Sequence, residues 1–171
     1  MKLPARIRDL LHPIRGSLFL SALLIFIDVV LSCSYMFSLF VCPIWFFVAL
    51  IRARPFDTGV AAARVLAPVV TGLLIFANSE WQNDIAQARA ERIVEACQRY
   101  HEANGTYPAK LVDLVPQYLS AIPSAKYCGA WAEFFYHKSP DDERAILWWV
   151  ELPPFGCRTY NFAASRWGYL D

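Results

Sequence analysis

The pattern of apolar and polar positions divides this chain into an apolar first part and a mixed second part. Residues 17–51 contain a single charge, Asp28, and basic residues flank this run on both sides. A transmembrane helix needs about 20 apolar residues, whereas one helix of this length would reach about 52 Å. The run therefore predicts a hairpin of two spans, with its turn near residues 32–34 and with Pro43 as a tolerated kink.

A second apolar stretch, residues 59–77, is interrupted by Arg64 and Pro68. Arg64 lies near the start of the stretch, where its side chain can reach back to the interface, so the pattern favours a third span. The alternative for a stretch of this marginal length is a buried or interfacial helix.

Charge is distributed unevenly along the chain. Residues 1–77 hold seven Lys and Arg against three Asp and Glu, and residues 78–171 hold nine against twelve. Basic loops tend to stay in the cytoplasm. We therefore expect residues 1–16 and the linker 52–58 to be cytoplasmic, with 78–171 forming a small domain on the outer side of the inner membrane. The protein is thus expected to be multi-pass and in contact with membrane lipids.

The domain is expected to begin with an amphipathic helix over residues 80–103. Apolar positions recur there at helical spacing, and Gly105 is a typical terminator. The positions that form this stripe are Ala86, Ala90, Ile93, Cys97 and Tyr100.

A short helix is expected after Pro108, with Leu111 and Leu114 on its buried face. Four runs rich in aromatic and β-branched residues then predict an antiparallel meander: 131–137, 145–151, 155–163 and 166–170. The helical stripe should be covered by Phe134, Tyr136, Leu147, Trp149 and Phe162. The expected fold class is an α+β membrane protein with three transmembrane helices, the third continuing into a long helix packed on a small sheet.

Residues 100–119 carry a recognisable motif: Gly105 after the long helix, Tyr107-Pro108, two spaced leucines, and a Val-Pro-Gln-Tyr-Leu segment, with Ile122-Pro123 shortly after. This segment resembles the pattern of type IV pilins and of the major pseudopilins of type II secretion. The resemblance implies a pilin-like fold for the exported domain.

The chain also departs from that family. Pilin precursors are cut after a Gly and carry a Glu five residues later, whereas here Ser21 follows Gly16 and Ala77 follows Gly72 at that spacing. The acidic residues 141–143 are better explained as a hairpin turn than as the calcium loop of major pseudopilins. We therefore expect an anchored relative of these domains that is not a filament subunit.

The five cysteines are sorted by compartment. Cys33 and Cys42 lie in the apolar run and are expected to behave as small apolar residues. The other three lie in the domain placed outside, where disulfides persist. A pair between Cys128 and Cys157 is favoured, although three cysteines allow three single pairings and Cys97 also fits a buried thiol.

No catalytic motif is recognisable. Cys97 and His101 lie four apart on one helix face, and with His137 they form the best candidate set for a metal or an activated thiolate. The position of Cys97 on the core stripe argues against this, so no catalytic residue, metal or cofactor is expected. Asp28 is a candidate functional acid. It could pair with a polar group of a partner helix or be protonated among Ser21, Ser32 and Ser34. The alternative is a neutral acid that is hydrogen-bonded within its own helix bundle.

Eleven aromatic residues between positions 131 and 171 exceed what so small a core readily buries. Exposed aromatic residues mark contact sites, so we expect an interaction protein that binds an envelope or membrane protein. No nucleic acid and no small-molecule substrate are expected. The alternatives are a membrane enzyme or redox protein using the Cys97 set, and a membrane immunity or accessory protein. The interaction candidates are Trp131, Phe135, Trp148, Trp167 and Tyr169.

Overall fold

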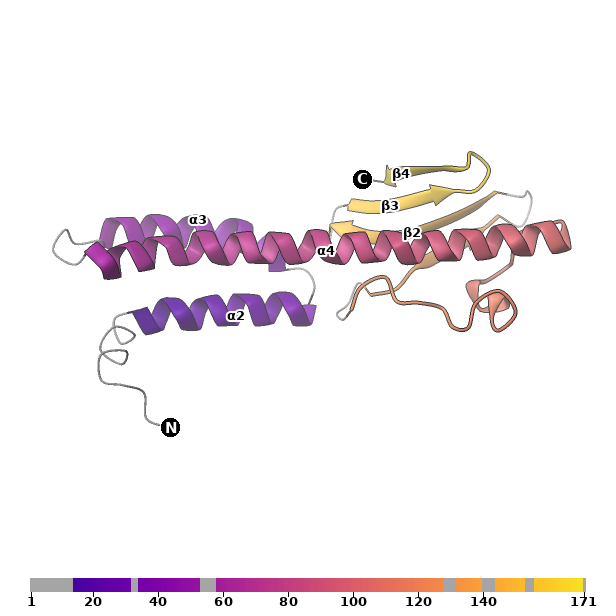
Figure 1. Cartoon of the computed structure of the whole chain (residues 1–171). Helices are drawn as coiled ribbons and strands as arrows, with labels where there is room; N and C mark the ends of the chain where they lie inside the picture. Colours follow the sequence, from indigo (N-terminus) through magenta and orange to yellow (C-terminus); the bar gives the residue numbers. More distant parts are fainter. Residues whose placement is uncertain are drawn as a thin grey trace, which may run out of the picture. The chain divides into compact units, whose positions relative to one another are not determined.

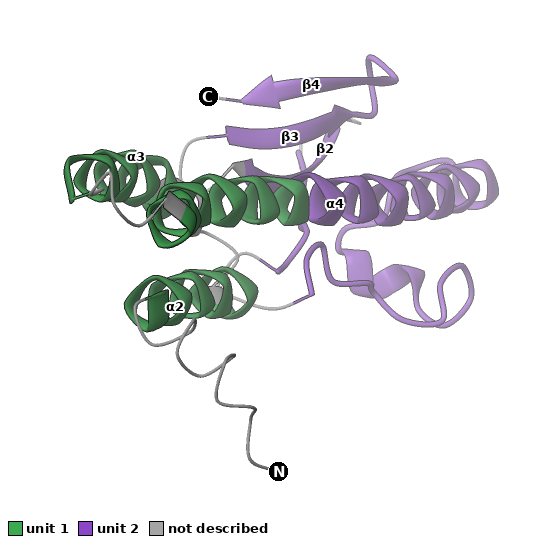
Figure 2. Cartoon of the chain, turned by 60° about the vertical axis from the view of Figure 1, so that its left-hand side comes forward, with its two compact units in different colours: residues 1–79 green, residues 80–171 purple. Residues whose placement is uncertain are grey.

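The chain forms two compact units, residues 1–79 and 80–171, in a computed structural model (Figures 1 and 2). The structure describes residues 14–31, 34–52, 58–127, 132–139, 144–152 and 156–170.

The first unit is helical. It contains α2 (Arg15–Leu31), α3 (Ser34–Arg52) and the beginning of the longest helix, α4 (Thr58–Asn104). Two hydrogen bonds link α2 to α4: one from Thr71 to Ser21, and one from Asn78 to Asp28, both 2.8 Å long. Both pairs are separated by fifty positions, so α2 and α4 run parallel and meet again after two helical turns.

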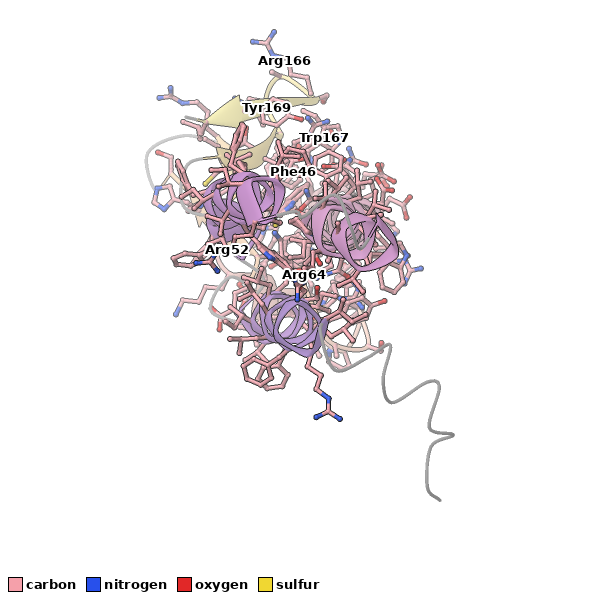
Figure 3. All side chains as sticks on the ribbon, turned by 90° about the vertical axis from the view of Figure 1, so that its left-hand side faces the viewer. Phe46, Arg52, Arg64, Arg166, Trp167 and Tyr169 are labelled. Atoms are coloured by element: carbon pink, nitrogen blue, oxygen red, sulfur yellow. The ribbon has the colours of Figure 1, made fainter. Side chains whose placement is uncertain are left out.

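The described arginines of this unit gather toward one end of it. Arg15 begins α2, and Arg64 lies in the second turn of the parallel helix α4. Arg52 ends α3 just before the chain enters α4, and Figure 3 shows Arg52 and Arg64 in the view onto that end. Basic side chains thus mark the end of the unit at which α4 begins.

Polar side chains are buried in this unit, whereas large apolar ones face outward. Asp28 is 4% exposed and Thr71 is 2% exposed. The outward positions of all three helices include Phe19, Phe26, Phe40, Phe47, Leu73 and Phe76, each more than half exposed. Water-soluble proteins show the opposite preference, so this distribution is unusual for a surface in contact with water.

The prediction of three transmembrane helices is wrong. Among the described helices only α4 is long and apolar enough to cross a membrane. The helix α2 has 17 residues and reaches about 26 Å, short of the roughly 30 Å hydrocarbon core. In α3 the described apolar segment, Phe37–Arg52, is also too short. Counting apolar residues over 17–51 gave the length of the run and not the length of each helix.

The second unit combines the second half of α4 with a sheet. The helix ends at Asn104, and Gly105 follows with a φ of +72°, a conformation that favours glycine. A short 3₁₀ helix, η2 (Leu111–Leu114), comes next. The four strands are β1 (Phe135–Lys138), β2 (Ala145–Leu152), β3 (Gly156–Asn161) and β4 (Arg166–Leu170).

The strands form one antiparallel sheet in the order β1-β2-β3-β4, which confirms the predicted meander. The second half of α4 lies across one face of this sheet (Figure 1). The buried helix positions are Ala86, Ala90, Ile93 and Cys97, and they join Phe134, Leu147, Trp149 and Phe162 in one core. Tyr100 and Tyr136 pack at its edge, so the predicted stripe and its covering are confirmed.

Candidate interaction surface

The sheet has two unlike faces. Because side chains alternate along a strand, the residues between the core positions point away from α4. We call this side the outer face. Cross-strand partners form rows on it, and the central row contains Phe135, Trp148, Thr159 and Gly168. The row on one side of it contains His137, Ile146, Asn161 and Arg166, and the row on the other side contains Val150, Cys157 and Leu170.

An aromatic pair dominates the outer face. The rings of Phe135 and Trp148 stack with centroids 5.6 Å apart and planes 20° apart, and these residues are direct cross-strand partners. Phe135 is 37% exposed. In the same row Thr159 is buried and is followed by Gly168, which has no side chain. The aromatic pair therefore borders a flat strip of sheet.

Apolar and charged residues flank the pair on opposite sides. Leu170, at the end of edge strand β4, is 54% exposed. The opposite row ends in Arg166, whose side chain extends away from the sheet in Figure 3. A partly exposed aromatic centre with an arginine at its rim is the composition that protein interfaces favour.

The other predicted interaction residues lie elsewhere. Trp167 is half-buried on the α4 side, with its ring centroid 4.7 Å from that of Tyr160. Tyr169 also points to that side but is 61% exposed, and the Arg158 guanidinium lies 4.4 Å from its ring centroid. Trp131 lies outside the described residues. Only Phe135 and Trp148 are therefore brought together.

The structure places His137 on the opposite face of the sheet from Cys97, so the proposed catalytic set is not brought together. Cys97 is fully buried under the sheet, and burial raises the pKa of its thiol to about 12. His101 stacks on Tyr107, with ring centroids 4.4 Å apart, while His137 lies on the outer face. A thiol of such high pKa is a poor nucleophile and a poor metal ligand. The described residues contain no group of three His, Cys, Asp or Glu side chains that would hold a metal.

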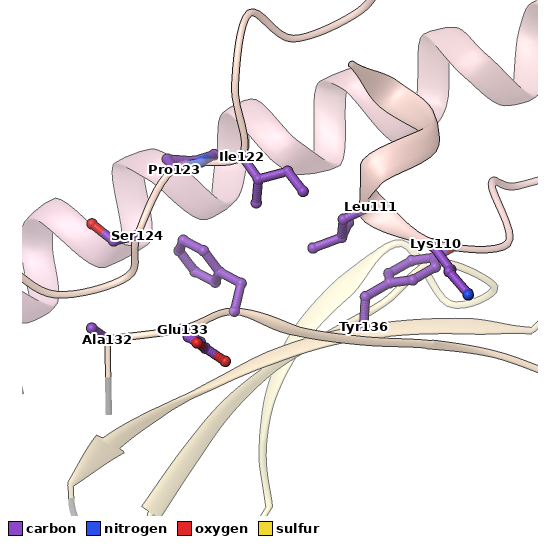
Figure 4. A pocket seen from close by; sticks show the side chains of 9 residues that line it. Lys110, Leu111, Ile122, Pro123, Ser124, Ala132, Glu133 and Tyr136 are labelled. Atoms are coloured by element: carbon purple, nitrogen blue, oxygen red, sulfur yellow. The ribbon is translucent and has the colours of Figure 1, made fainter. Parts of the chain in front are cut away.

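A hollow of about 610 Å³ lies beside η2 and β1 (Figure 4). It is lined mainly by apolar atoms of Leu111, Ile122 and Phe134, with Lys110 and Glu133 among its lining residues. Tyr136 donates a hydrogen bond to the Pro108 carbonyl, and burial followed by the nearby Cys97 and Tyr107 raises the pKa of its hydroxyl. The Tyr136 hydroxyl is therefore held in the protonated form and occupied by the Pro108 carbonyl.

The remaining predicted residues divide between the two units. Asp28 is buried and accepts its hydrogen bond from Asn78, which matches the alternative in which the acid is bonded within its own bundle. Cys42 and Cys157 carry free thiols, and Cys157 is half-buried in β3. Cys33 and Cys128 lie outside the described residues, so the expected Cys128–Cys157 pair stays a prediction.

Sequence reasoning missed a second aromatic contact. The ring centroids of Trp81 and Tyr127 lie 5.5 Å apart, although 46 positions separate these residues in the sequence. Arg89 reaches the same place and donates to the Ser124 carbonyl at 2.8 Å. The signal available in the sequence was a tryptophan four residues after the apolar stretch that ends at Ala77.

Comparison with known proteins adds no relative. No family model, no curated protein and no solved structure matches this chain.

Proposed function

We propose that this protein is a membrane-anchored, non-enzymatic interaction protein. In this proposal α4 holds the chain in the bilayer, and the sheet domain binds another envelope protein through the outer face. The observation that carries the proposal is the stacked pair Phe135 and Trp148, on the sheet face opposite to α4. We include in it the pilin-like character of residues 80–171, which rests on the motif around Gly105 and on the long helix packed over a meander.

The anchor is argued from the first half of α4. The helix carries an apolar stretch over residues 59–77, with Arg64 near its start, in which Leu66, Leu73 and Phe76 are each more than half exposed. Lipid is the covering that such a surface fits, and α4 is long enough to reach across it. The proposal gives α2 and α3 no crossing of their own.

The side of the membrane follows from charge. Arg15, Arg52 and Arg64 belong to the end of the unit at which α4 begins, and basic residues favour the cytoplasmic side. One crossing by α4 then carries residues 80–171 to the outer side. This proposal places the anchored chain in the cytoplasmic membrane, with its sheet domain outside.

Binding is proposed instead of catalysis because the exposed chemistry is aromatic. A buried tryptophan at an interface contributes about 2 kcal/mol or more when truncated, which corresponds to roughly thirtyfold in affinity. The outer face offers such a residue beside a flat strip, whereas the Cys97 thiol is sequestered. An envelope protein with an apolar patch is the partner this surface fits.

Site-specific photo-crosslinking in intact cells tests the proposal. A photoreactive phenylalanine analogue replaces Phe135, and in a matched control it replaces Val112, which is 59% exposed on η2. We expect one defined cross-linked protein from position 135, lost when Trp148→Thr is added, and none from position 112. Equal products from both positions, or a product that Trp148→Thr leaves unchanged, would overturn the proposed surface.

A further inference from the structure

A second exposed aromatic pair lies at the start of the sheet domain. Trp81 and Tyr127 are each 55% exposed. Their ring centroids lie 5.5 Å apart, and the ring planes are inclined by 38°. Trp149, in the core of the same unit, is only 1% exposed. The pair is therefore a surface feature and does not belong to the core.

The pair is held in place by Arg89. Its guanidinium lies 5.4 Å from the Tyr127 ring centroid. It also donates hydrogen bonds to the Ser124 carbonyl at 2.8 Å and to the Ser124 hydroxyl at 3.2 Å. These contacts tie the loop that carries Tyr127 to α4, beside the ring of Trp81.

The position of Trp81 along α4 is informative. The apolar stretch ends at Ala77, and polar residues begin at Asn78. Trp81 follows Ala77 by four residues, which is about 6 Å along the helix axis. The polar interface of a bilayer extends about 5 to 8 Å beyond the hydrocarbon on each side. If the span ends at Ala77, the indole falls within that layer.

Tryptophan and tyrosine are the residues that this layer favours. Their rings are apolar enough to leave water, and their N–H and O–H groups can donate to lipid phosphate and carbonyl oxygens. Two such rings, exposed and in contact, match this environment better than they match water. Glu80 and Asp84 lie close by on the helix, so attraction to anionic lipid is not what selects the site.

We propose that Trp81 and Tyr127 form an interfacial anchor that inserts among the lipid headgroups on the outer side of the membrane. The partner is the lipid surface itself, and zwitterionic headgroups suffice. The anchor sets the depth of the helix and ties the loop ending at Tyr127 to the membrane. This inference rests on the proposed function, because it requires that α4 is embedded.

Fluorescence quenching by brominated lipid tests the anchor. The full chain is placed in phosphatidylcholine nanodiscs, with and without lipid brominated on the upper part of its acyl chains. The protein has six tryptophans, so the emission of Trp81 is obtained as the difference between wild type and Trp81→Phe. Trp148→Phe gives the matched control from the outer face of the sheet. Tyr127→Trp, added to Trp81→Phe, reports on the second position.

We expect the emission assigned to Trp81 to fall by about half or more in brominated lipid, as for an indole at the interface. The emission added by Tyr127→Trp should fall to a similar extent. The emission assigned to Trp148 should change little. If the chain stays in the nanodiscs and neither position 81 nor position 127 is quenched, the anchor is overturned while the proposed function stands. A chain that does not enter nanodiscs at all overturns both.

Discussion

Cys97 provides a direct test of whether this domain has thiol chemistry. Its side chain is fully buried, and its pKa is raised from the usual 9.0 to about 12. This shift lowers the thiolate fraction near neutral pH about a thousandfold, and the thiolate is the reactive form. Burial further blocks the approach of any reagent. In the folded protein Cys97 should therefore react at least about a thousand times more slowly than an exposed cysteine.

The assay is alkylation of the full chain in detergent, followed over time by mass spectrometry of the peptide that contains position 97. The matched control is Gln98→Cys in a Cys97→Ala background, because Gln98 is exposed on the same helix one residue away. Denaturant should make both cysteines equally reactive. Labelling of Cys97 in the folded protein at the rate of the control would refute the burial argument and revive the redox interpretation.

Three further outcomes follow from the packing. Ile93→Ala removes part of a fully buried side chain and should lower the free energy of unfolding by about 2–5 kcal/mol and the Tm by about 10 °C or more. Ile122→Ala, at a partly exposed position, should change the Tm little. Equal shifts in Tm would contradict the assigned core. Asn78→Leu removes a donor to buried Asp28 and should lower the free energy of unfolding by about 1–3 kcal/mol in thermal melts, and an unchanged melt would contradict the bond. Because the pKa of Cys97 is raised on folding, the free energy of unfolding of the domain should fall as pH rises from about 9 toward 12. In Cys97→Ala the free energy of unfolding should depend less steeply on pH over this range. The same dependence in both proteins would argue against a buried thiol.

Much of the sheet domain is readable from periodicity. The helical stripe with Ile93 and Cys97, the stop at Gly105 and the four strands all depend on local spacing, which one sequence records directly. The face of the sheet that α4 covers was also predicted, although strand periodicity by itself does not decide it. Strand β2 is apolar on both sides, with Leu147 and Trp149 on one and Ile146 and Trp148 on the other, so alternation alone does not choose between them.

The helical unit shows the limit of counting apolar residues. The total length of the run 17–51 suggests two spans, but a span requires one uninterrupted helix of sufficient length, and where α2 ends depends on local packing. The partner of Asp28 was also hidden. Asn78 lies fifty positions away, and a hydrogen bond at that separation leaves no periodic signal in a single sequence.

We propose that α4 anchors the chain and carries the sheet domain to the outer side of the membrane. The most direct measurement is a pair of reporter fusions after Asp171 in a bacterial host, one active only in the cytoplasm and one active only outside it. The same pair fused after Arg52, before α4, is the matched control. We expect the outside signal at Asp171 and the cytoplasmic signal at Arg52. A cytoplasmic signal at both positions would contradict it.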